Sequence, residues 1–406
     1  MDCRHCGTGL QYIFLDLGYA PPSNAYLTKN DLNKPEIYYP LKVYVCDYCW
    51  LVQTEDYTEA EILFNSEYAY FSSTSVGWLE HAQRYTKKII KELNLQSNNY
   101  VVEIASNDGY LLKNFLAAGI PCLGIEPTNS TAEAAEELGI PVERKFFGET
   151  LSQQLAHNGK KADLIIGNNV YAHVPNINDF TKGLKTLLKP GGTITLEFPH
   201  VMRILENSQF DTIYHEHFSY LSLYTVKRIF EKKDLRIFNI EEISTHGGSL
   251  RIYGCHTNDS RKTEKSVDLI LKEEKQQGLQ KLDTYLNFQS RAEVIKDNLI
   301  RFLIKQKSLN KKVVAYGAAA KGNTLLNYAG IKKDFLPYVC DAAKAKQGKY
   351  LPGSHIPILP PENLFELNPD YVLILPWNIA SEVIKKYTKS EKKTKFIIAV
   401  PELKVL

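Results

Sequence analysis

The sequence predicts an α/β protein in which a small metal-binding module precedes two Rossmann-like units. Two Cys-x-x-Cys pairs fall near the N-terminus. The stretch 100–112 has the pattern of a buried strand, a tight loop and the start of a helix, and a similar pattern begins at residue 312. A chain of 406 residues with 44% hydrophobic residues can form two or three such units. We expect a zinc-binding module at 1–66, an α/β core at 67–256, and a helical connector with a Rossmann-like domain at 257–406.

The two cysteine pairs predict a structural zinc ion. Residues 38–45 alternate like a strand that leads into the second pair. Four thiolates complete a tetrahedral zinc site and leave no open position for catalysis. A redox site would instead need one Cys-x-x-Cys at the start of a helix. The predicted ligands are Cys3, Cys6, Cys46 and Cys49.

Charge, hydropathy and cysteine use argue against several classes of protein. The formal charge of +3 is small for a surface that binds nucleic acid or an anionic membrane. The chain lacks an apolar signal region at its start and any run of transmembrane length. Seven cysteines, an odd number, fit reduced thiols. We therefore expect a soluble, cytoplasmic protein without nucleic-acid or membrane partners; its oligomeric state stays open, with a monomer slightly favoured.

The loop after the first core strand and the acid after the second predict a nucleoside site. Strand 122–125 is followed by Glu126, whose carboxylate can accept hydrogen bonds from both hydroxyls of a ribose. The loop is not GxGxxG, which disfavours a dinucleotide. Its E-x-x-x-x-[DN]-G pattern is similar to that of class I methyltransferases, which bind S-adenosylmethionine. The loop residues expected at this cofactor are Glu103, Ala105, Asn107, Asp108 and Gly109, the glycine letting the ligand approach the backbone.

Later strands extend the same sheet. Strand 162–167 ends at Asn168 and Asn169, which we expect near the methionine end of the cofactor, because ligands bind at the carboxyl ends of parallel strands. The asparagine loop lacks the prolines that would indicate methylation of a base nitrogen. A Pro-Gly-Gly turn before strand 193–198 is common in class I methyltransferases, and strands 236–243 and 250–256 fit the antiparallel end of such a sheet.

The stretch 214–220 carries the densest chemistry in the chain, with two histidines, a glutamate and two tyrosines. A His-x-His pair can bind a metal from a strand. Alternatively, a histidine oriented by a glutamate can act as a general acid or base near neutral pH. A hydrogen-bonded loop without catalytic function is the third interpretation. We favour acid–base chemistry, because no third metal ligand lies at helical spacing nearby.

The C-terminal part begins with a turn of small residues at 317–324. Such a turn can present backbone N–H groups to a phosphate, and Lys321 adds positive charge. We therefore expect a diphosphate here, unless the turn is only a scaffold. The connector 258–309 is expected to be helical, because Glu and Lys alternate at i,i+4 spacing. The aromatic link 67–73 lies where a lid over the core would lie, or is a packed connector.

Long stretches of the chain, nearly end to end, closely resemble the nucleotide-sugar carbon-3 methyltransferases of deoxysugar pathways. These stretches are CRHC with CDYC, PPSNAY, EYAYFSS, VVEIASNDGYLL, LGIEPT, DLIIGNNVYAHVPNINDF, LEFPH, FDTIYHEHFSYLSL, THGGSLRIY and YGAAAKGNTLLNY. The resemblance implies methyl transfer from S-adenosylmethionine to carbon 3 of a TDP- or GDP-linked 4-keto-6-deoxyhexose.

The resemblance also assigns roles to individual residues. It implies that His217 is the base, with Glu216 and Tyr214 beside it, and that Tyr68 and His173 are further active-site residues. His173 is the alternative base. The nucleotide is expected on the C-terminal domain. The expected substrate contacts are Ala318, Lys321, Asn323, Thr324, Tyr220 and His246.

Two other classes of function remain open from the residues alone. A zinc-knuckle methyltransferase of nucleic acid, or of another small molecule, would share the zinc and cofactor motifs. A nucleotide-sensing module without catalysis would not need the histidine-rich stretch in a cleft. Turnover with S-adenosylmethionine separates the second class from an enzyme.

Overall fold

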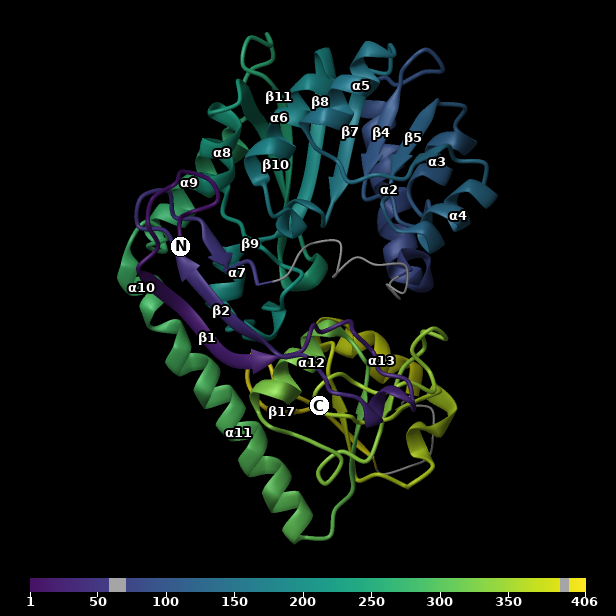
Figure 1. Ribbon diagram of the computed structural model, residues 1–406, viewed down its shortest axis with the longest axis vertical. Coiled ribbons are helices and arrows are strands. Elements are labelled where there is room, and N and C mark those ends of the chain that lie inside the picture. The colour runs from purple at the N-terminus through teal and green to yellow at the C-terminus, as the bar shows by residue number, and fades with distance from the viewer. Residues whose placement is uncertain (58–70, 388–393) are drawn as a thin grey trace.

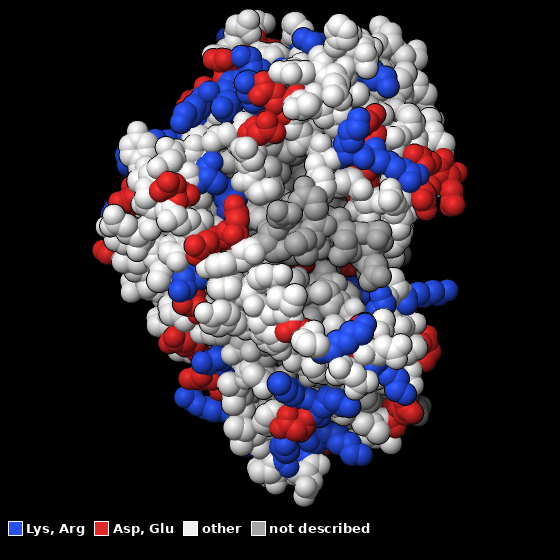
Figure 2. All heavy atoms as spheres, in the orientation of Figure 1, with Lys and Arg blue, Asp and Glu red and all other residues white. Residues whose placement is uncertain are grey.

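The computed structural model describes residues 1–57, 71–387 and 394–406, so the predicted site residue Tyr68 lies outside the described residues. Figure 1 shows two lobes joined along one side by a long helix. Among the described residues, no helix combines the length and apolar character needed to cross a membrane. Lys and Arg are interspersed with Asp and Glu over the face in view (Figure 2).

The upper lobe is built on a seven-stranded sheet of order β10-β11-β8-β7-β4-β5-β6. The strands β8, β7, β4, β5 and β6 are parallel to one another, whereas β11 pairs antiparallel with both β8 and β10, in agreement with the predicted antiparallel end of the sheet. Their bounds are β4 (Val101–Ile104), β5 (Cys122–Ile125), β6 (Val142–Glu143), β7 (Ala162–Asn168), β8 (Leu188–Pro199), β10 (Leu235–Ile243) and β11 (Ser249–His256). A parallel centre with two antiparallel strands at one edge is the sheet that the sequence predicted for this part of the chain.

Helices cover both faces of this sheet because the central strands are apolar on both sides. Side chains of α2, α3 and α4 share one core with Val101 and Ile166, and those of α5, α6, α8 and α9 share another with Val102 and Ile165. Polar caps begin three of these helices. Their bounds are α2 (Val76–Glu92), α3 (Leu112–Ala117), α4 (Asn129–Glu137), α5 (Glu149–His157), α6 (Ile177–Leu187), α8 (Leu223–Glu231) and α9 (Lys265–Gln276).

The N-terminal module contributes an antiparallel sheet of order β1-β2-β3-β9. Its bounds are β1 (Tyr12–Ala20), β2 (Tyr39–Val45), β3 (Val52–Thr54) and β9 (Ser219–Tyr220). The last strand belongs to the histidine-rich stretch, and Thr54 donates a hydrogen bond to the carbonyl of His217. The zinc-binding module therefore anchors the segment that carries the proposed base.

The lower lobe is a six-stranded sheet of order β14-β13-β12-β15-β16-β17, parallel except for β17. The long helix α11 packs Leu299 and Leu303 into a core that joins Leu15 of β1 to Val313 of β12. The remaining elements have the bounds α7 (Val201–Glu206), α10 (Leu282–Leu286), α11 (Phe288–Ser308), β12 (Val313–Tyr316), α12 (Ala320–Tyr328), β13 (Val339–Cys340), β14 (Ile358–Leu359), β15 (Tyr371–Ile374), α13 (Ala380–Tyr387), β16 (Lys395–Ile398) and β17 (Lys404–Val405). This shared core holds the two lobes against each other.

Candidate active site

A cavity of about 560 Å³ lies between the carboxyl ends of the core strands and the C-terminal domain. It brings together side chains from segments that are far apart in the sequence. Ten of the predicted site residues line it: Ala105, Asn107, Glu126, Asn168, Asn169, His173, Tyr214, His217, His246 and Lys321. The other predicted residues that the structure describes do not line this cavity; they are Glu103, Asp108, Gly109, Glu216, Tyr220, Ala318, Asn323 and Thr324.

The loop after β4 is folded tightly by three residues in the left-handed region. Ala105 has φ 56°, Asn107 has φ 50° and Gly109 has φ 74°. A Cβ on Gly109 would lie 2.5 Å from Cδ1 of Ile140 and 3.2 Å from Cβ of Ala135. The glycine is therefore needed for the backbone conformation and for packing against α4. Gly109 does not line the cavity, and the expectation that it lets the ligand approach the backbone stays a prediction.

Glu126 organises this loop from the end of β5. Its carboxylate accepts hydrogen bonds from the backbone N–H groups of Asn107, at 3.0 Å, and Thr128, at 2.9 Å. A carboxylate has about four lone-pair positions, so two remain for ribose hydroxyls. Burial raises the pKa of Glu126. Glu103, buried below the loop, has a pKa raised well above its usual value, by burial and then by the charges of Asp108 and Glu126.

The loop after β7 supplies polar groups to the same cavity. Both polar atoms of the Asn168 side chain are buried without a hydrogen-bond partner among the described residues. Asn169 donates from Nδ2 to Nε2 of His246 at 3.2 Å. A buried polar group left unpaired is costly, so Asn168 fits a polar ligand in this cavity. With Glu126, these residues suit the ribose and amino-acid ends of S-adenosylmethionine.

His217 lies in the turn between α7 and β9, with its ring in the cavity wall. Its Nδ1 lies 2.9 Å from the carbonyl oxygen of Thr212, which can only accept a hydrogen bond, so Nδ1 carries the proton and Nε2 keeps its lone pair. The ring centroid lies 4.0 Å from that of Tyr214 and 4.6 Å from that of His173. Three aromatic rings from two loops thus lie next to one another.

Burial keeps the histidines of the cavity neutral. The pKa of His217 is lowered well below its usual value by burial first, and then by the nearby His173. Burial also lowers the pKa of His173 and of His246 to about 4. A neutral imidazole has the lone pair that a general base requires.

Glu216 and Tyr220 lie beside this turn, outside the cavity lining. Glu216 is buried and accepts a hydrogen bond from Nδ2 of Asn24, a residue that lines the cavity. Tyr220 packs its ring 5.8 Å from that of His217. His215 faces away, toward the carbonyl of Pro40. Among the described residues, no metal-binding group of side chains includes these histidines, which removes the support for a metal site here.

The turn after β12 uses most of its polar groups inside the protein. The N–H of Ala318 is bonded to the carboxylate of Asp341, so the expectation that this amide is exposed to a phosphate was wrong. Asn323 donates to Ser23 and Thr324 to Ile213. Lys321 does line the cavity, and its Nζ lies 4.6 Å from the centre of the Trp377 ring.

Sequence reasoning missed several cavity residues. Lys346 donates to the carbonyl of Ala318 and lies on the same wall as Lys321. Trp78, from α2, and Asn24, from the PPSNAY loop, line other walls. Lys346 belongs to an irregular lysine-rich loop, where no periodicity indicates which side chain turns inward. Asn24 could have been found, because the PPSNAY stretch is one of those that resemble the methyltransferase family.

The four predicted zinc ligands form one cluster. Their Sγ atoms all lie within 4.8 Å of one another, with Cys3 and Cys49 at 3.4 Å and Cys6 and Cys46 at 3.6 Å. Four sulfurs about 2.3 Å from a central Zn²⁺ lie roughly 3.8 Å apart, so the cluster fits a structural zinc ion. Three of the four cysteines are buried.

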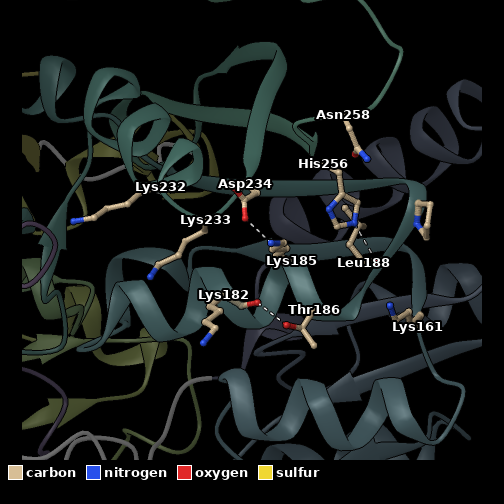
Figure 3. A pocket seen from close by; sticks show the side chains of 11 residues that line it. Lys161, Lys182, Lys185, Thr186, Leu188, Lys232, Lys233, Asp234, His256 and Asn258 are labelled. Carbon is tan, nitrogen blue, oxygen red and sulfur yellow. Dashed lines mark hydrogen bonds and ion pairs between the residues drawn. The ribbon is translucent and has the colours of Figure 1, made fainter.

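A second cavity, of about 620 Å³, lies at the amino ends of β7 and β8 (Figure 3). Lys185 in its wall pairs with Asp234 at 2.5 Å, and Lys182 pairs with Glu149 at 2.7 Å. None of the predicted site residues lines it. The sequence motifs and the cavity at the carboxyl ends of the strands therefore define the candidate active site.

Three family models match successive parts of the chain. A zinc binding domain matches residues 3–64, a methyltransferase domain matches residues 78–239, and a C-methyltransferase C-terminal domain matches residues 244–401. The C-methyltransferase NovU of Streptomyces niveus is 33% identical over 407 aligned residues, which cover 100% of this chain and 96% of NovU.

Solved structures of methyltransferases are similar to about half of the chain or less. The magnesium protoporphyrin IX methyltransferase of Synechocystis PCC 6803 with bound SAM is 13% identical, with a TM-score of 0.36, over 50% of this chain and 99% of that one. The glycopeptide N-methyltransferase MtfA with sinefungin is 10% identical, with a TM-score of 0.34, over 43% and 94%. The full-length match to NovU and the three successive domains show that this chain belongs to the S-adenosylmethionine-dependent C-methyltransferases.

Proposed function

We propose that this enzyme transfers a methyl group from S-adenosylmethionine to carbon 3 of a nucleotide-linked 4-keto-6-deoxyhexose, with His217 as the base. One observation carries the proposal: the cofactor loop, an imidazole with a fixed tautomer and Lys321 all line one cavity. A proton on a carbon next to a ketone can be removed by a modest base, because the enolate is delocalised. The enzyme must then supply a base, donors for the enolate oxygen and proximity to the methyl donor.

His217 suits the role of the base. The Thr212 carbonyl holds its proton on Nδ1, so Nε2 is the atom that takes the proton from carbon 3. His173 and Tyr214 lie beside it, and the hydroxyl of Tyr214 can donate a hydrogen bond to the developing enolate oxygen. Such a donor is worth roughly 3 kcal/mol at best. Glu216 does not face the substrate itself; it orients Asn24, whose side chain lines the cavity, by accepting its hydrogen bond.

The cofactor and the nucleotide take opposite walls of the cavity in this proposal. Glu126 binds the ribose hydroxyls, and Asn168 binds the methionine end. S-adenosylmethionine supplies an electrophilic methyl group on a sulfonium. On the other wall, Lys321 and Lys346 present two ammonium groups to the diphosphate. Burial lowers the pKa of Lys321, and an anion beside it would reverse that effect.

Exchange of the carbon-3 proton with deuterium tests the base without methyl transfer. His217→Asn keeps a side-chain N–H that can reach the Thr212 carbonyl but removes the basic nitrogen. We expect exchange and methylation to fall together by about 10²–10⁴-fold, while nucleotide and cofactor still bind. His215→Asn is the matched control, because that histidine faces Pro40 outside the cavity. Exchange at the wild-type rate in His217→Asn would transfer the role to His173.

A substrate screen tests the sugar nucleotide itself. Thymidine- and guanosine-linked 4-keto-6-deoxy sugars are incubated with the enzyme and S-adenosylmethionine, and methyl incorporation is read by mass. We expect one nucleotide series to gain a single methyl group at carbon 3. Methylation of none of these sugars would contradict the proposed substrate and leave the C-methyltransferase assignment intact.

A further inference from the structure

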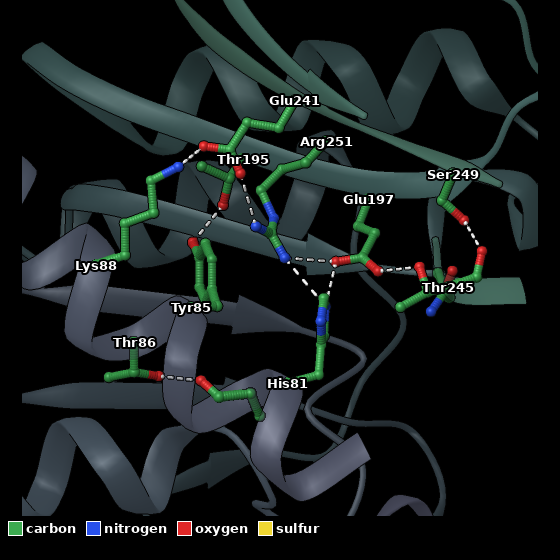
Figure 4. Close-up of polar contacts among 12 residues, drawn as sticks. His81, Tyr85, Thr86, Lys88, Thr195, Glu197, Glu241, Thr245, Ser249 and Arg251 are labelled. Atoms are coloured by element: carbon green, nitrogen blue, oxygen red, sulfur yellow. Dashed lines mark hydrogen bonds and ion pairs between the residues drawn. The ribbon is translucent and has the colours of Figure 1, made fainter. Parts of the chain in front are cut away.

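Glu197 lies at the carboxyl end of β8, directly beneath the cofactor side of the cavity. Its side chain is 0% exposed. Three side chains from three elements converge on its carboxylate (Figure 4). Arg251 of β11 donates from Nη2 at 2.8 Å, His81 of α2 lies at 2.9 Å through Nε2, and the hydroxyl of Thr245 donates at 2.9 Å.

One arm of this network reaches the cavity through His81. The imidazole of His81 stacks on the indole of Trp78, with ring centroids 4.9 Å apart and planes 18° apart. Trp78 lines the cavity and lies 6.0 Å from Tyr110, another lining residue. Glu197 therefore fixes the imidazole against which the indole is placed.

The second arm reaches the cavity through the loop that begins at Thr245. Within this loop His246 has φ 54°, a strained conformation for a residue with a side chain. His246 accepts a hydrogen bond from Asn169, which also has φ 54°. The backbone N–H of Asn169 donates to the backbone oxygen of Glu197 at 2.7 Å. Glu197 thus holds both sides of the His246–Asn169 contact.

A buried ionic network of this kind needs a reason other than stability. Burying charges carries a large desolvation cost, and well-packed apolar residues often stabilise a fold equally well. What the carboxylate provides is geometry, because it binds three elements at fixed distances. We propose that Glu197 is a positioning residue that sets the cofactor wall of the cavity, formed by Trp78 on one arm and by Asn169 with His246 on the other. The proposal rests on the placement of S-adenosylmethionine over the loop 105–109.

Glu241 offers a matched control within the same network. It accepts hydrogen bonds from Nη1 of Arg251 at 3.1 Å and from the hydroxyl of Tyr253 at 2.9 Å, and it pairs with Lys88. None of these three partners lines the cavity. Glu241→Gln therefore disturbs the same arginine, whose Nη2 also lies 3.1 Å from Nε2 of His81, while it leaves the carboxylate of Glu197 in place.

The test is the dissociation constant of S-adenosylmethionine, measured by calorimetry together with Tm. We expect Glu197→Gln to weaken binding about tenfold, the size of a lost charge-assisted contact, while Glu241→Gln stays within about twofold. Thr245→Val, which cuts one arm only, should weaken binding about threefold and provides the test if Glu197→Gln does not fold. The KM for the sugar nucleotide should change less than the cofactor dissociation constant in each variant, because the lysine wall contacts the network only where Nζ of Lys321 lies 3.4 Å from the backbone oxygen of His246.

Two results would overturn the proposal. One is cofactor affinity within twofold of wild type in Glu197→Gln or, where that variant does not fold, in Thr245→Val. The other is an equal loss in Glu241→Gln, which would mean that disturbing Arg251 alone is sufficient. Cofactor binding by Glu126→Ala shows whether a negative result means that Glu197 has no positioning role or that the cofactor binds elsewhere. If Glu126→Ala weakens binding and Glu197→Gln does not, only the positioning role fails; if neither does, the cofactor lies elsewhere.

Discussion

Replacing Glu126 by alanine should separate its structural role from its role in binding. The carboxylate accepts two backbone hydrogen bonds, from Asn107 and Thr128, and is 5% exposed. A hydrogen bond to a charged group is worth about 1.5–3 kcal/mol, and two of them sum to roughly 3–6 kcal/mol. Burial of the carboxylate, which also raises its pKa, offsets part of that gain.

We therefore expect the free energy of unfolding to fall by roughly 2 kcal/mol in Glu126→Ala. For a domain of this size that lowers Tm by about 4–8 °C, which leaves the protein folded at 25 °C. The ribose hydroxyls lose a charged acceptor as well, so cofactor binding should weaken by about 1–3 kcal/mol, or roughly 5- to 150-fold in Kd. Calorimetry with S-adenosylmethionine measures the binding, and thermal unfolding measures the stability.

Two variants bracket the result. Glu126→Gln keeps the volume but has one acceptor oxygen for two amides, so both losses should be intermediate. Glu133→Ala removes an exposed carboxylate on α4 that pairs with Arg144 at 3.3 Å, and should change stability by less than about 1 kcal/mol. If Glu126→Ala lowers Tm while the cofactor Kd is unchanged, then Glu126 only supports the loop and the ribose lies elsewhere.

Metal analysis of reduced, freshly purified protein should find about one zinc ion per chain, and chelation of that ion should lower Tm. Protein that folds without zinc would contradict the four-cysteine site. Gly109→Ala should lower the free energy of unfolding by about 2–4 kcal/mol, because it combines a left-handed φ with a clash against Ile140. Gly119→Ala, with φ 70° and open space around it, should cost only about 1–2 kcal/mol, and equal losses would refute the packing argument. Because burial holds the pKa of His217 below 6.5, protonation should lower kcat/KM only below about pH 6.5, and an acid limb centred above pH 7 would be inconsistent with this base.

The order of the elements and the residue types at the strand ends follow from the amino-acid sequence alone. Short, mainly apolar runs such as Val101–Ile104, followed by turn residues, predict buried strands, and small or charged residues directly after them indicate where a ligand binds in a parallel sheet. The cysteine spacing predicted the metal cluster for the same local reason. The resemblance supplied the C-methyltransferase activity, which the full-length match to NovU confirms.

Which polar side chains face the cavity depends on the tertiary structure. Glu216, Asn323 and Thr324 have the residue types of site residues, yet they do not line the cavity and instead bond the chain itself. Conversely, Glu197 falls in the LEFPH stretch, but nothing in that stretch indicates its contacts, because its partners lie 116, 48 and 54 positions away. Local patterns encode an element and its buried face, whereas the direction of a polar side chain depends on partners that folding brings from distant segments.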